Sequence, residues 1–193
     1  MFIEPYIHQQ RTGWLEVICG CMFSGKTEEL IRRLKRVKIA RQQVEIFKPV
    51  IDVRYDKINV VSHDENYIAS TPVHHSGEIL ILAGSNEVIG IDEGQFFDPE
   101  LPEVCSTLTQ KGIRVIVAGL DMDFTGKPFG PMPQLLAAAE YITKVHAICM
   151  VCGNLASYSF RKSLKKTVVM LGEKDCYEPR CRNCFNEGMK QHH

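Results

Sequence analysis

The sequence predicts an α/β protein in which a doubly wound, mostly parallel sheet is followed by a small metal-binding unit. Apolar, strand-like runs alternate with helix-like segments over residues 14–148, as in a parallel sheet covered by helices on both faces. A glycine-rich loop follows the first run, and two Cys-x-x-Cys pairs follow the last. We therefore expect an α/β domain at residues 1–147 and a metal-binding domain at residues 148–193.

The composition is that of a globular chain without net charge. The 193 residues are 45% hydrophobic, and 23 Lys and Arg balance 23 Asp and Glu. No charge excess attracts nucleic acid or an anionic membrane, and no apolar run approaches the ~18 residues that a membrane-spanning helix needs. The first residues lack the features of a signal peptide. We expect a cytoplasmic protein, in which eight cysteines do not predict a disulfide framework.

The first strand is predicted at residues 14–19 and runs into a phosphate-binding loop. Residues 20–27 read GCMFSGKT and match G-x-x-x-x-G-K-S/T between a strand and a helix, the context that this motif requires. The glycines let backbone N–H groups surround a phosphate, and the helix start favours anions. A chance glycine-rich turn is the alternative, which the flanking elements disfavour. The residues assigned to phosphate binding are Gly20, Cys21, Met22, Phe23, Ser24, Gly25, Lys26 and Thr27.

Two of these loop residues have specific predicted tasks. Lys26 is expected to reach the β and γ phosphates, and Thr27 is expected to give its hydroxyl to Mg²⁺.

The helix that follows Thr27 has an apolar face formed by Leu30, Ile31, Leu34, Val37 and Ile39. Its basic run, residues 32–38, suits either a nucleic-acid surface or a solvated face. Glu28 and Glu29 precede Arg32 and Arg33 by four residues, an order that favours ion pairs along a helix surface. These acids and the zero net charge favour the solvated face.

A second strand is predicted at residues 44–47, stopped by Pro49. Asp52 and Arg54 follow just beyond its end, where ligands bind in open parallel sheets; surface loop charges are the alternative. Short extended pieces are expected within residues 58–75, and a short helix at residues 77–83.

The apolar run at residues 87–92 ends in Asp92. This is the Walker B pattern, whose aspartate helps to hold magnesium. Glu93 follows directly and can accept a proton from whatever attacks the γ phosphate. If water attacks, the protein is an ATPase; if a substrate hydroxyl attacks, it is a kinase. The alternative is an acid that only orients the metal.

The remaining elements of the α/β domain follow in order. We expect a helix at residues 98–112, a buried strand at 113–120, a loop at 121–133, a helix at 133–141 and a strand at 142–148. Aromatic residues after Glu93 and in the 121–133 loop either stack a nucleobase or pack the loops.

Cys149, Cys152, Cys181 and Cys184 form the two Cys-x-x-Cys pairs. Two such knuckles complete a tetrahedral zinc site, which is structural because all four positions are filled. A redox pair and buried free thiols are the alternatives; two matched pairs in a reducing compartment favour zinc. The other cysteines, Cys19, Cys21, Cys105 and Cys176, are expected to be buried or partly buried.

Taken together, the motifs resemble the zinc-containing thymidine kinase family of the cellular and bacterial type. The resemblance runs over about residues 13–185 and rests on the phosphate loop, DVRY at 52–55, DEGQFF at 92–97, GLDMDFTGKPFG at 119–130 and the four cysteines. It implies a RecA-like P-loop domain and a zinc-ribbon-like domain that carries a flexible lasso loop.

The family implies transfer of the ATP γ-phosphoryl group to the 5′-hydroxyl of thymidine, and also of deoxyuridine, in thymidine salvage for DNA synthesis. Glu93 is then the general base, with Mg²⁺ held near Thr27 and Asp92. Arg54 and Arg161 are expected beside the phosphates, Asp52 near the same site, and Gln95 in the triphosphate or acceptor surroundings.

The resemblance also implies a nucleoside pocket. Its expected members are Met22, Phe96, Leu120, Phe124, Phe129, Ser159 and Tyr177, with backbone groups of Val168, Val169, Met170, Leu171 and Gly172 reading the base. The family further implies a homotetramer inhibited by dTTP.

Two other classes remain as alternatives. A RecA-like ATPase with a zinc ribbon acting on nucleic acid requires a basic surface, which the charge balance disfavours. A nucleotide-binding regulatory module without turnover is disfavoured by Glu93 beside a magnesium site.

Overall fold

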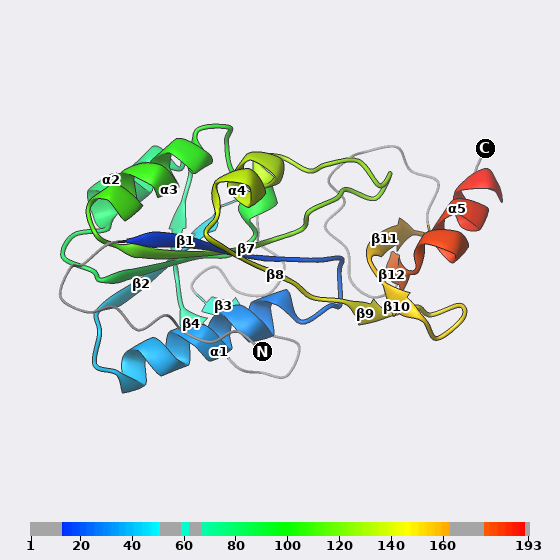
Figure 1. The fold of residues 1–193 in the computed structure, drawn as a ribbon, viewed down its shortest axis with the longest axis horizontal. Coiled ribbons are helices and arrows are strands. Elements are labelled where there is room, and N and C mark those ends of the chain that lie inside the picture. The colour runs from blue at the N-terminus through cyan, green and yellow to red at the C-terminus, as the bar shows by residue number, and fades with distance from the viewer. Residues whose placement is uncertain (1–12, 51–58, 62–66, 163–175, 192–193) are drawn as a thin grey trace.

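The computed structural model describes residues 13–50, 59–61, 67–162 and 176–191. A six-stranded sheet with helices on both faces forms the larger part of the fold. A smaller C-terminal module, made of β9–β12 and α5, lies beyond the ends of the strands of that sheet (Figure 1). None of the helices within these ranges combines the length and apolar character needed to cross a membrane.

All six strands of the sheet are parallel, in the order β5-β2-β6-β7-β1-β8. β7 therefore lies between β1, which leads into the glycine-rich loop, and β6, which leads to Asp92. β6 and β7 are buried along their whole length, as continuous apolar runs in a covered parallel sheet should be. The strands are β1 Trp14–Cys19, β2 Val44–Pro49, β5 Thr71–Val73, β6 Val88–Ile91, β7 Arg114–Gly119 and β8 Tyr141–Lys144.

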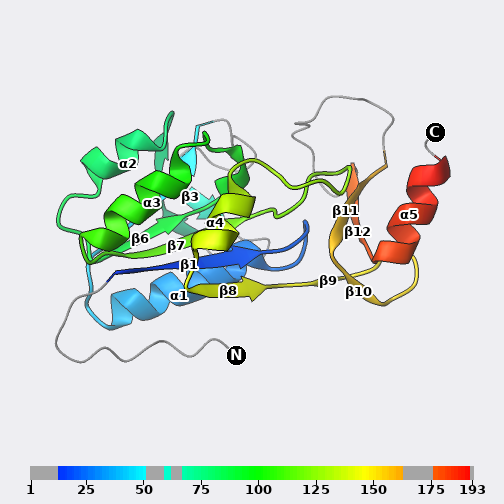
Figure 2. The same cartoon turned by 45° about the horizontal axis from the view of Figure 1, so that its top comes forward.

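Helices cover both faces of the sheet, so the predicted doubly wound α/β class is confirmed. α1 (Lys26–Ile39) packs on one face, and α2 (Gly77–Leu82), α3 (Leu101–Gln110) and α4 (Met132–Ala138) pack on the other (Figure 2). Each face has its own apolar core, because successive strand residues point to opposite sides. Ile18 of β1 belongs to the core under α1, whereas Val17 belongs to the core under α3.

Two predicted boundaries near the end of the sheet were wrong. The helix expected at residues 133–141 ends at Ala138, and Tyr141 starts β8. The chain has already crossed to the sheet there, since Glu140 accepts a hydrogen bond from the Leu15 N–H (2.7 Å). The strand expected at residues 142–148 is two strands, β8 and β9 (Ala147–Ile148). The predicted domain boundary falls within β9, and as a domain division it stays a prediction.

The basic face of α1 is solvated except at one residue, where the prediction was wrong. Arg33 is fully buried and its Nη1 lies 2.7 Å from Oε2 of Glu16, which is also fully buried. Glu16 Oε1 accepts from Arg114 Nε and Trp14 Nε1, each at 2.7 Å. Arg33 also pairs with Glu29 (2.8 Å). A charged residue in the middle of β1 therefore draws one arginine of α1 inward.

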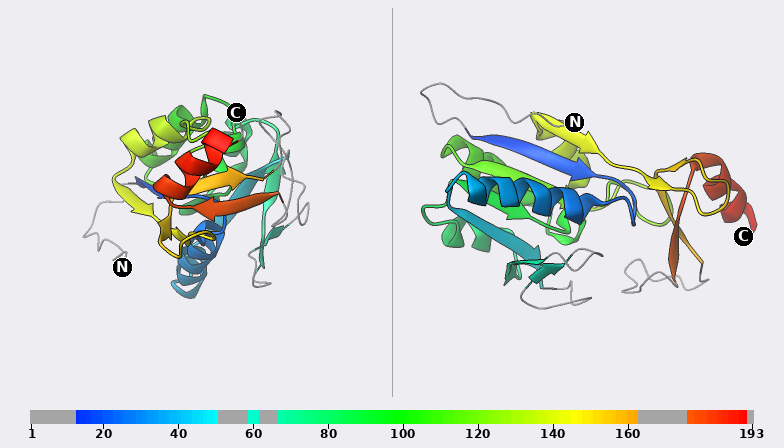
Figure 3. Two further views of the ribbon diagram at one scale, coloured as in Figure 1. Left: turned by 90° about the vertical axis from the view of Figure 1, so that its right-hand side faces the viewer. Right: turned by 90° about the horizontal axis from the view of Figure 1, so that it is seen from below.

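The C-terminal module consists of two small antiparallel pairs and a helix (Figure 3). β9 pairs with β10 (Leu155–Ala156), β11 (Tyr158–Arg161) pairs with β12 (Tyr177–Arg180), and α5 covers Arg182–Gln191. The ring of Phe185 on α5 stacks on Tyr158 at 4.5 Å and meets Phe160 edge-on at 6.2 Å. The remaining elements are β3 (Asn59–Val61), β4 (Tyr67–Ala69) and the 3-10 helix η1 (Gly94–Phe96).

Candidate functional site

The predicted site residues gather where the parallel strands end and the C-terminal module begins. The glycine-rich loop follows β1, Asp92 follows β6, and Leu120 follows β7. The C-terminal module faces this edge of the sheet (Figure 2). The carboxyl edge of an open parallel sheet is the place where such folds bind ligands.

The glycine-rich loop has a backbone that excludes side chains at its start. A Cβ on Gly20, whose φ is 152°, would lie 2.3 Å from the Val145 carbonyl oxygen. Gly25, at φ 85°, precedes the first residue of α1. Within the loop, Ser24 Oγ and Lys26 Nζ both donate to the Cys21 carbonyl, at 2.7 and 2.8 Å. The lysine thus lies over the loop, where it adds positive charge to the helix start.

The loop is attached directly to the C-terminal module. The Met22 N–H donates to Ser159 Oγ (3.0 Å) on β11, and Cys21 Sγ contacts the Ala156 carbonyl (3.4 Å) on β10. Cys21 shares an apolar cluster with Cys149 and Cys184, and burial raises the pKa of its thiol. The predicted neighbours Met22 and Ser159 are therefore in contact.

The two acids after β6 have different surroundings. Asp92 is buried, and its Oδ1 accepts the Glu93 N–H at 3.0 Å. Glu93 is half-buried, with a left-handed backbone (φ 54°). Gln95 Nε2 donates to Glu93 Oε2, and Gln95 Oε1 accepts the Leu120 N–H at 2.8 Å. Three predicted site residues, Glu93, Gln95 and Leu120, are thereby connected.

The predicted aromatic residues form two groups. Phe96 and Phe129 meet edge-to-face, with ring centroids 5.6 Å apart. The Arg161 guanidinium lies 3.6 Å from the centre of the Phe124 ring, and its Nε and Nη2 donate to the Tyr177 hydroxyl at 3.1 and 2.7 Å. Arg161, predicted beside the phosphates, thus contacts residues predicted around the nucleoside. Phe97 joins the apolar core.

An ion pair that the sequence analysis did not single out lies at the same edge. Lys144 Nζ is 2.6 Å from Asp121 Oδ2, and since β1 lies between β7 and β8, the pair spans the root of the glycine-rich loop. Partial burial acts against the ammonium, but the hydrogen bond and charge of Asp121 raise the pKa of Lys144. The sequence could have indicated this pair through position, because both residues stand at the carboxyl ends of strands.

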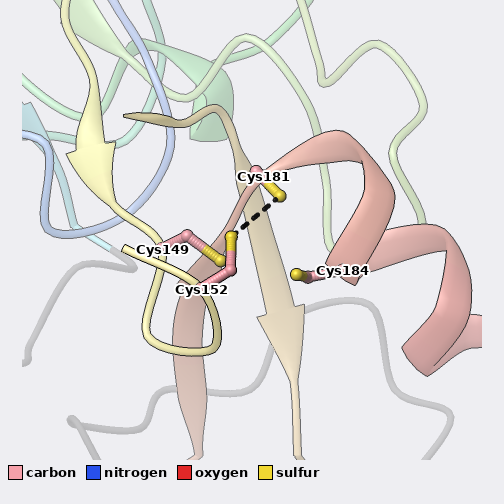
Figure 4. A group of neighbouring side chains, drawn as sticks. All are labelled: Cys149, Cys152, Cys181 and Cys184. Carbon is pink, nitrogen blue, oxygen red and sulfur yellow. Dashed lines mark hydrogen bonds between the residues drawn. The ribbon is translucent and has the colours of Figure 1, made fainter. Parts of the chain in front are cut away.

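The four cysteines of the two knuckles come together in space (Figure 4). Their Sγ atoms all lie within 4.8 Å of one another, and Cys152 and Cys181 are 3.6 Å apart. The first knuckle turns at Gly153, which has φ 77° and donates its N–H to the Cys149 carbonyl (2.9 Å). Four sulfurs around a tetrahedral zinc are about 3.8 Å apart, so this donor set fits zinc.

Two thiols of the cysteine cluster have pKa values shifted in opposite directions. Burial opposes ionisation of Cys149, but hydrogen bonds from backbone N–H groups lower its pKa to about 6. Hydrogen bonds with Cys152 and Cys181, together with burial, raise the pKa of Cys184 to about 12. Crowded thiolates repel one another, and a bound divalent ion would offset this repulsion because it binds the deprotonated form.

Seven predicted site residues lie outside the residues that the structure describes. They are Asp52, Arg54, Val168, Val169, Met170, Leu171 and Gly172. Their predicted roles stay predictions. The buried or partly buried state expected for Cys19, Cys21, Cys105 and Cys176 is confirmed.

A glycine-rich phosphate loop, two acids directly after β6 and a four-cysteine cluster define a P-loop nucleotide-binding α/β protein with a zinc-binding module. The model of the thymidine kinase family matches residues 13–185, and the chain belongs to this family.

The chain is 62% identical over 177 residues to the thymidine kinase of Porphyromonas gingivalis, covering 92% of this chain and 87% of that protein. With the Bacteroides thetaiotaomicron enzyme it shares 59% over 186 residues, covering 96% and 94%, and with the Bdellovibrio bacteriovorus enzyme 52% over 181 residues, covering 93% and 88%.

Proposed function

We propose that the chain is an ATP-dependent thymidine kinase. It transfers the γ-phosphoryl group of ATP to the 5′-hydroxyl of thymidine, and of deoxyuridine, giving the nucleoside monophosphate and ADP in pyrimidine salvage. The observation that carries this proposal is Glu93, a carboxylate just after β6, where only β7 separates β6 from the strand that leads into the loop with Lys26. Membership of the thymidine kinase family supports the choice of substrate.

The glycine-rich loop binds the donor. Its backbone N–H groups and Lys26 hold the β and γ phosphates, and Lys26 leaves the Cys21 carbonyl to do so. The Thr27 hydroxyl and Asp92 would hold Mg²⁺, which offsets phosphate charge when bound. Arg54 and Asp52 complete this site in our proposal.

Glu93 acts as the general base. Its carboxylate accepts the proton of the 5′-hydroxyl while the hydroxyl oxygen attacks the γ phosphorus and ADP leaves. Gly25–Lys26 and the loop N–H groups stabilise the charge on the moving phosphoryl group. For this reaction the ribose of the nucleoside has to lie between Glu93, at the end of β6, and the glycine-rich loop.

The nucleoside is held between loops of the sheet and the C-terminal module. Phe96, Phe124 and Phe129 offer ring faces to a base, and Arg161 holds Phe124 and Tyr177 together. These contacts give Arg161 a role in shaping the pocket beside its predicted role at the phosphates. Met22, Leu120 and Ser159 surround the thymine methyl, and backbone groups of residues 168–172 read the base edge.

Further properties complete the proposal: dTTP inhibition and the homotetramer are inferred from the family, and the location and excluded partners from the composition. We infer feedback inhibition by dTTP, assembly into a homotetramer and a cytoplasmic location, and no action on nucleic acid or membranes.

The test is an assay with ATP and Mg²⁺ against a panel of nucleosides, on wild type and Glu93→Gln. Wild type should give monophosphate from thymidine and deoxyuridine. Glu93→Gln should lower kcat by roughly 10²–10⁴-fold while ATP and thymidine still bind, because the shape is kept and the proton acceptor is lost. Glu103→Gln, an exposed change on α3, is the matched control. A Glu93→Gln enzyme within a few-fold of wild type would rule out the base assignment.

A further inference from the structure

We propose that Gln95 is a positioning residue that fixes the Glu93 carboxylate relative to the acceptor-binding loop, rather than a ligand of the phosphates. The inference rests on the proposed function of Glu93 as the base. The resemblance to the family places Gln95 only in the surroundings of the triphosphate or the acceptor. Its contacts assign it a more specific task.

The orientation of the Gln95 amide is determined by the backbone. Its side chain is buried, with the whole residue 2% exposed. Oε1 lies 2.8 Å from the Leu120 backbone nitrogen, and an N–H can only be accepted by the oxygen end of an amide. Nε2 must then point the other way, where it donates to Glu93 Oε2. The assignment of the two amide atoms therefore does not depend on Glu93.

The surroundings of Gln95 keep it in place. A Cβ on Gly130 would lie 2.2 Å from the Gln95 carbonyl oxygen, and φ at Gly130 is 52°. A Cβ on Gly119 would lie 3.0 Å from Gln95 Oε1 and 2.6 Å from Met132 Sδ. Gly130 thus packs against the main chain of Gln95, and Gly119 packs against its side-chain amide, which is buried. A side chain enclosed in this way cannot swing out to a phosphate.

The amide connects the two groups that must meet during transfer. One end holds the carboxylate of the base, whose residue has a left-handed backbone at the end of β6. The other end holds Leu120, the first residue of the loop that carries Phe124 and Phe129. Restraining the carboxylate rotamer keeps the base aimed at the hydroxyl, and displacement by even 1 Å can cost about 10²-fold in rate.

Gln95→Glu separates this role from phosphate binding. The variant keeps the volume and the acceptor for the Leu120 N–H, but it places a second carboxylate against Glu93 in place of a donor. We expect kcat to fall at least tenfold while the KM values for ATP and thymidine stay within about twofold. Gln110→Glu, exposed on α3, controls for the added charge. A raised KM for ATP with kcat kept would overturn the proposal.

A double variant tests whether Gln95 acts through Glu93. In the Glu93→Gln background there is no carboxylate to aim, so adding Gln95→Glu should change the residual rate less than twofold. Loss of a further tenfold would show that Gln95 acts on its own. An inactive wild type would refute the proposed function instead, which the panel assay reveals separately.

Hydrogen exchange gives a reading that does not require activity. Gln95→Met removes the acceptor of the Leu120 N–H, so exchange at that amide should accelerate at least tenfold, whereas Gln95→Glu should leave it protected. Equal protection of Leu120 in all three proteins would overturn the proposed connection.

Discussion

The sheet and the C-terminal module are stabilised in different ways. The sheet buries two large clusters of aliphatic side chains, one on each face, which is the main source of stability in domains of this kind. The C-terminal module has two-stranded sheets, and its cluster next to the sheet is mostly cysteine with two alanines. The module has a small aromatic cluster of its own, Tyr158, Phe160 and Phe185. Because isolated two-stranded sheets are marginally stable, we expect the module to depend on its metal and the sheet not to.

The two parts nevertheless share contacts at the site. Cys21 of the glycine-rich loop packs in the same cluster as the cysteines Cys149 and Cys184, and Met22 is hydrogen-bonded to β11. Loss of the metal should affect the nucleoside pocket most, because Ser159, Arg161 and Tyr177 lie on β11 and β12 of the module itself. The donor loop should be affected less, since it meets the module only through Cys21 and Met22 among the contacts described.

Removal of zinc should have the largest effect, confined to the C-terminal module. Chelation, or Cys152→Ser, takes away a binding free energy on the order of 10 kcal/mol, so the hairpins should loosen and the KM for thymidine should rise at least tenfold. The KM for ATP should change by less than about threefold. Hydrogen exchange, zinc content and steady-state kinetics measure this, with Cys176→Ser as the matched control. An unchanged KM for thymidine in metal-free protein would contradict the proposal that the C-terminal module and its nucleoside contacts depend on zinc.

Removing the buried carboxylate of Glu16 should have the second largest effect, on the stability of the sheet, and should leave zinc binding unchanged. Glu16→Gln removes the buried carboxylate that Arg33 and Arg114 share, although Arg33 keeps its pair with Glu29. The free energy of unfolding should fall by about 3–5 kcal/mol. Zinc content should stay at wild-type level, since the pair lies in the sheet. Urea unfolding and metal analysis provide the two readings; a loss below 1 kcal/mol would show that this network stabilises little.

The exposed ion pair between Arg32 and Glu29 on α1 should contribute least to the free energy of unfolding. Hydrogen bonds from Arg32, together with Arg33, lower the pKa of Glu29 despite partial burial. The lowered pKa means that this stabilisation exists above the usual carboxyl range and disappears as the pH falls through the native pKa. Arg32→Ala should cost no more than about 0.5 kcal/mol at neutral pH. In urea titrations at strongly acidic pH, wild type and Arg32→Ala should have the same free energy of unfolding. A difference that grows as the pH falls would contradict the assigned direction of the Glu29 pKa shift.

The parts of the fold that the sequence predicted are those with strong local signals. β1, β6 and β7 are short, mostly apolar runs. Gly20 follows β1, Asp92 follows β6 and β7 ends in Gly119, and the backbone of the phosphate loop itself requires glycines at Gly20 and Gly25. The cysteine knuckles could be paired from spacing because one tetrahedral ion requires four ligands. The four sulfurs do come together.

The features that were missed depend on contacts between distant segments. Arg33 has the same local pattern as its exposed neighbours, and only Glu16 on β1 explains its burial. Tyr141 continues a helical pattern but pairs with Glu16 in the sheet, so tertiary pairing overrides local preference. The bond from Gln95 to Leu120 joins two loops 25 residues apart, and no motif records it.

The position of β7 has a consequence for how mutations affect this enzyme. Val17 of β1 and Ile91 of β6 both pair with Val117, so the strands that lead to the donor loop and to the proton acceptor are two strand spacings apart, about 10 Å. Main-chain hydrogen bonds determine this gap, whatever side chains β7 carries. Substitutions along β7 that preserve both strand pairing and packing should therefore leave unchanged the distance over which phosphate passes from the nucleotide donor to the nucleoside acceptor.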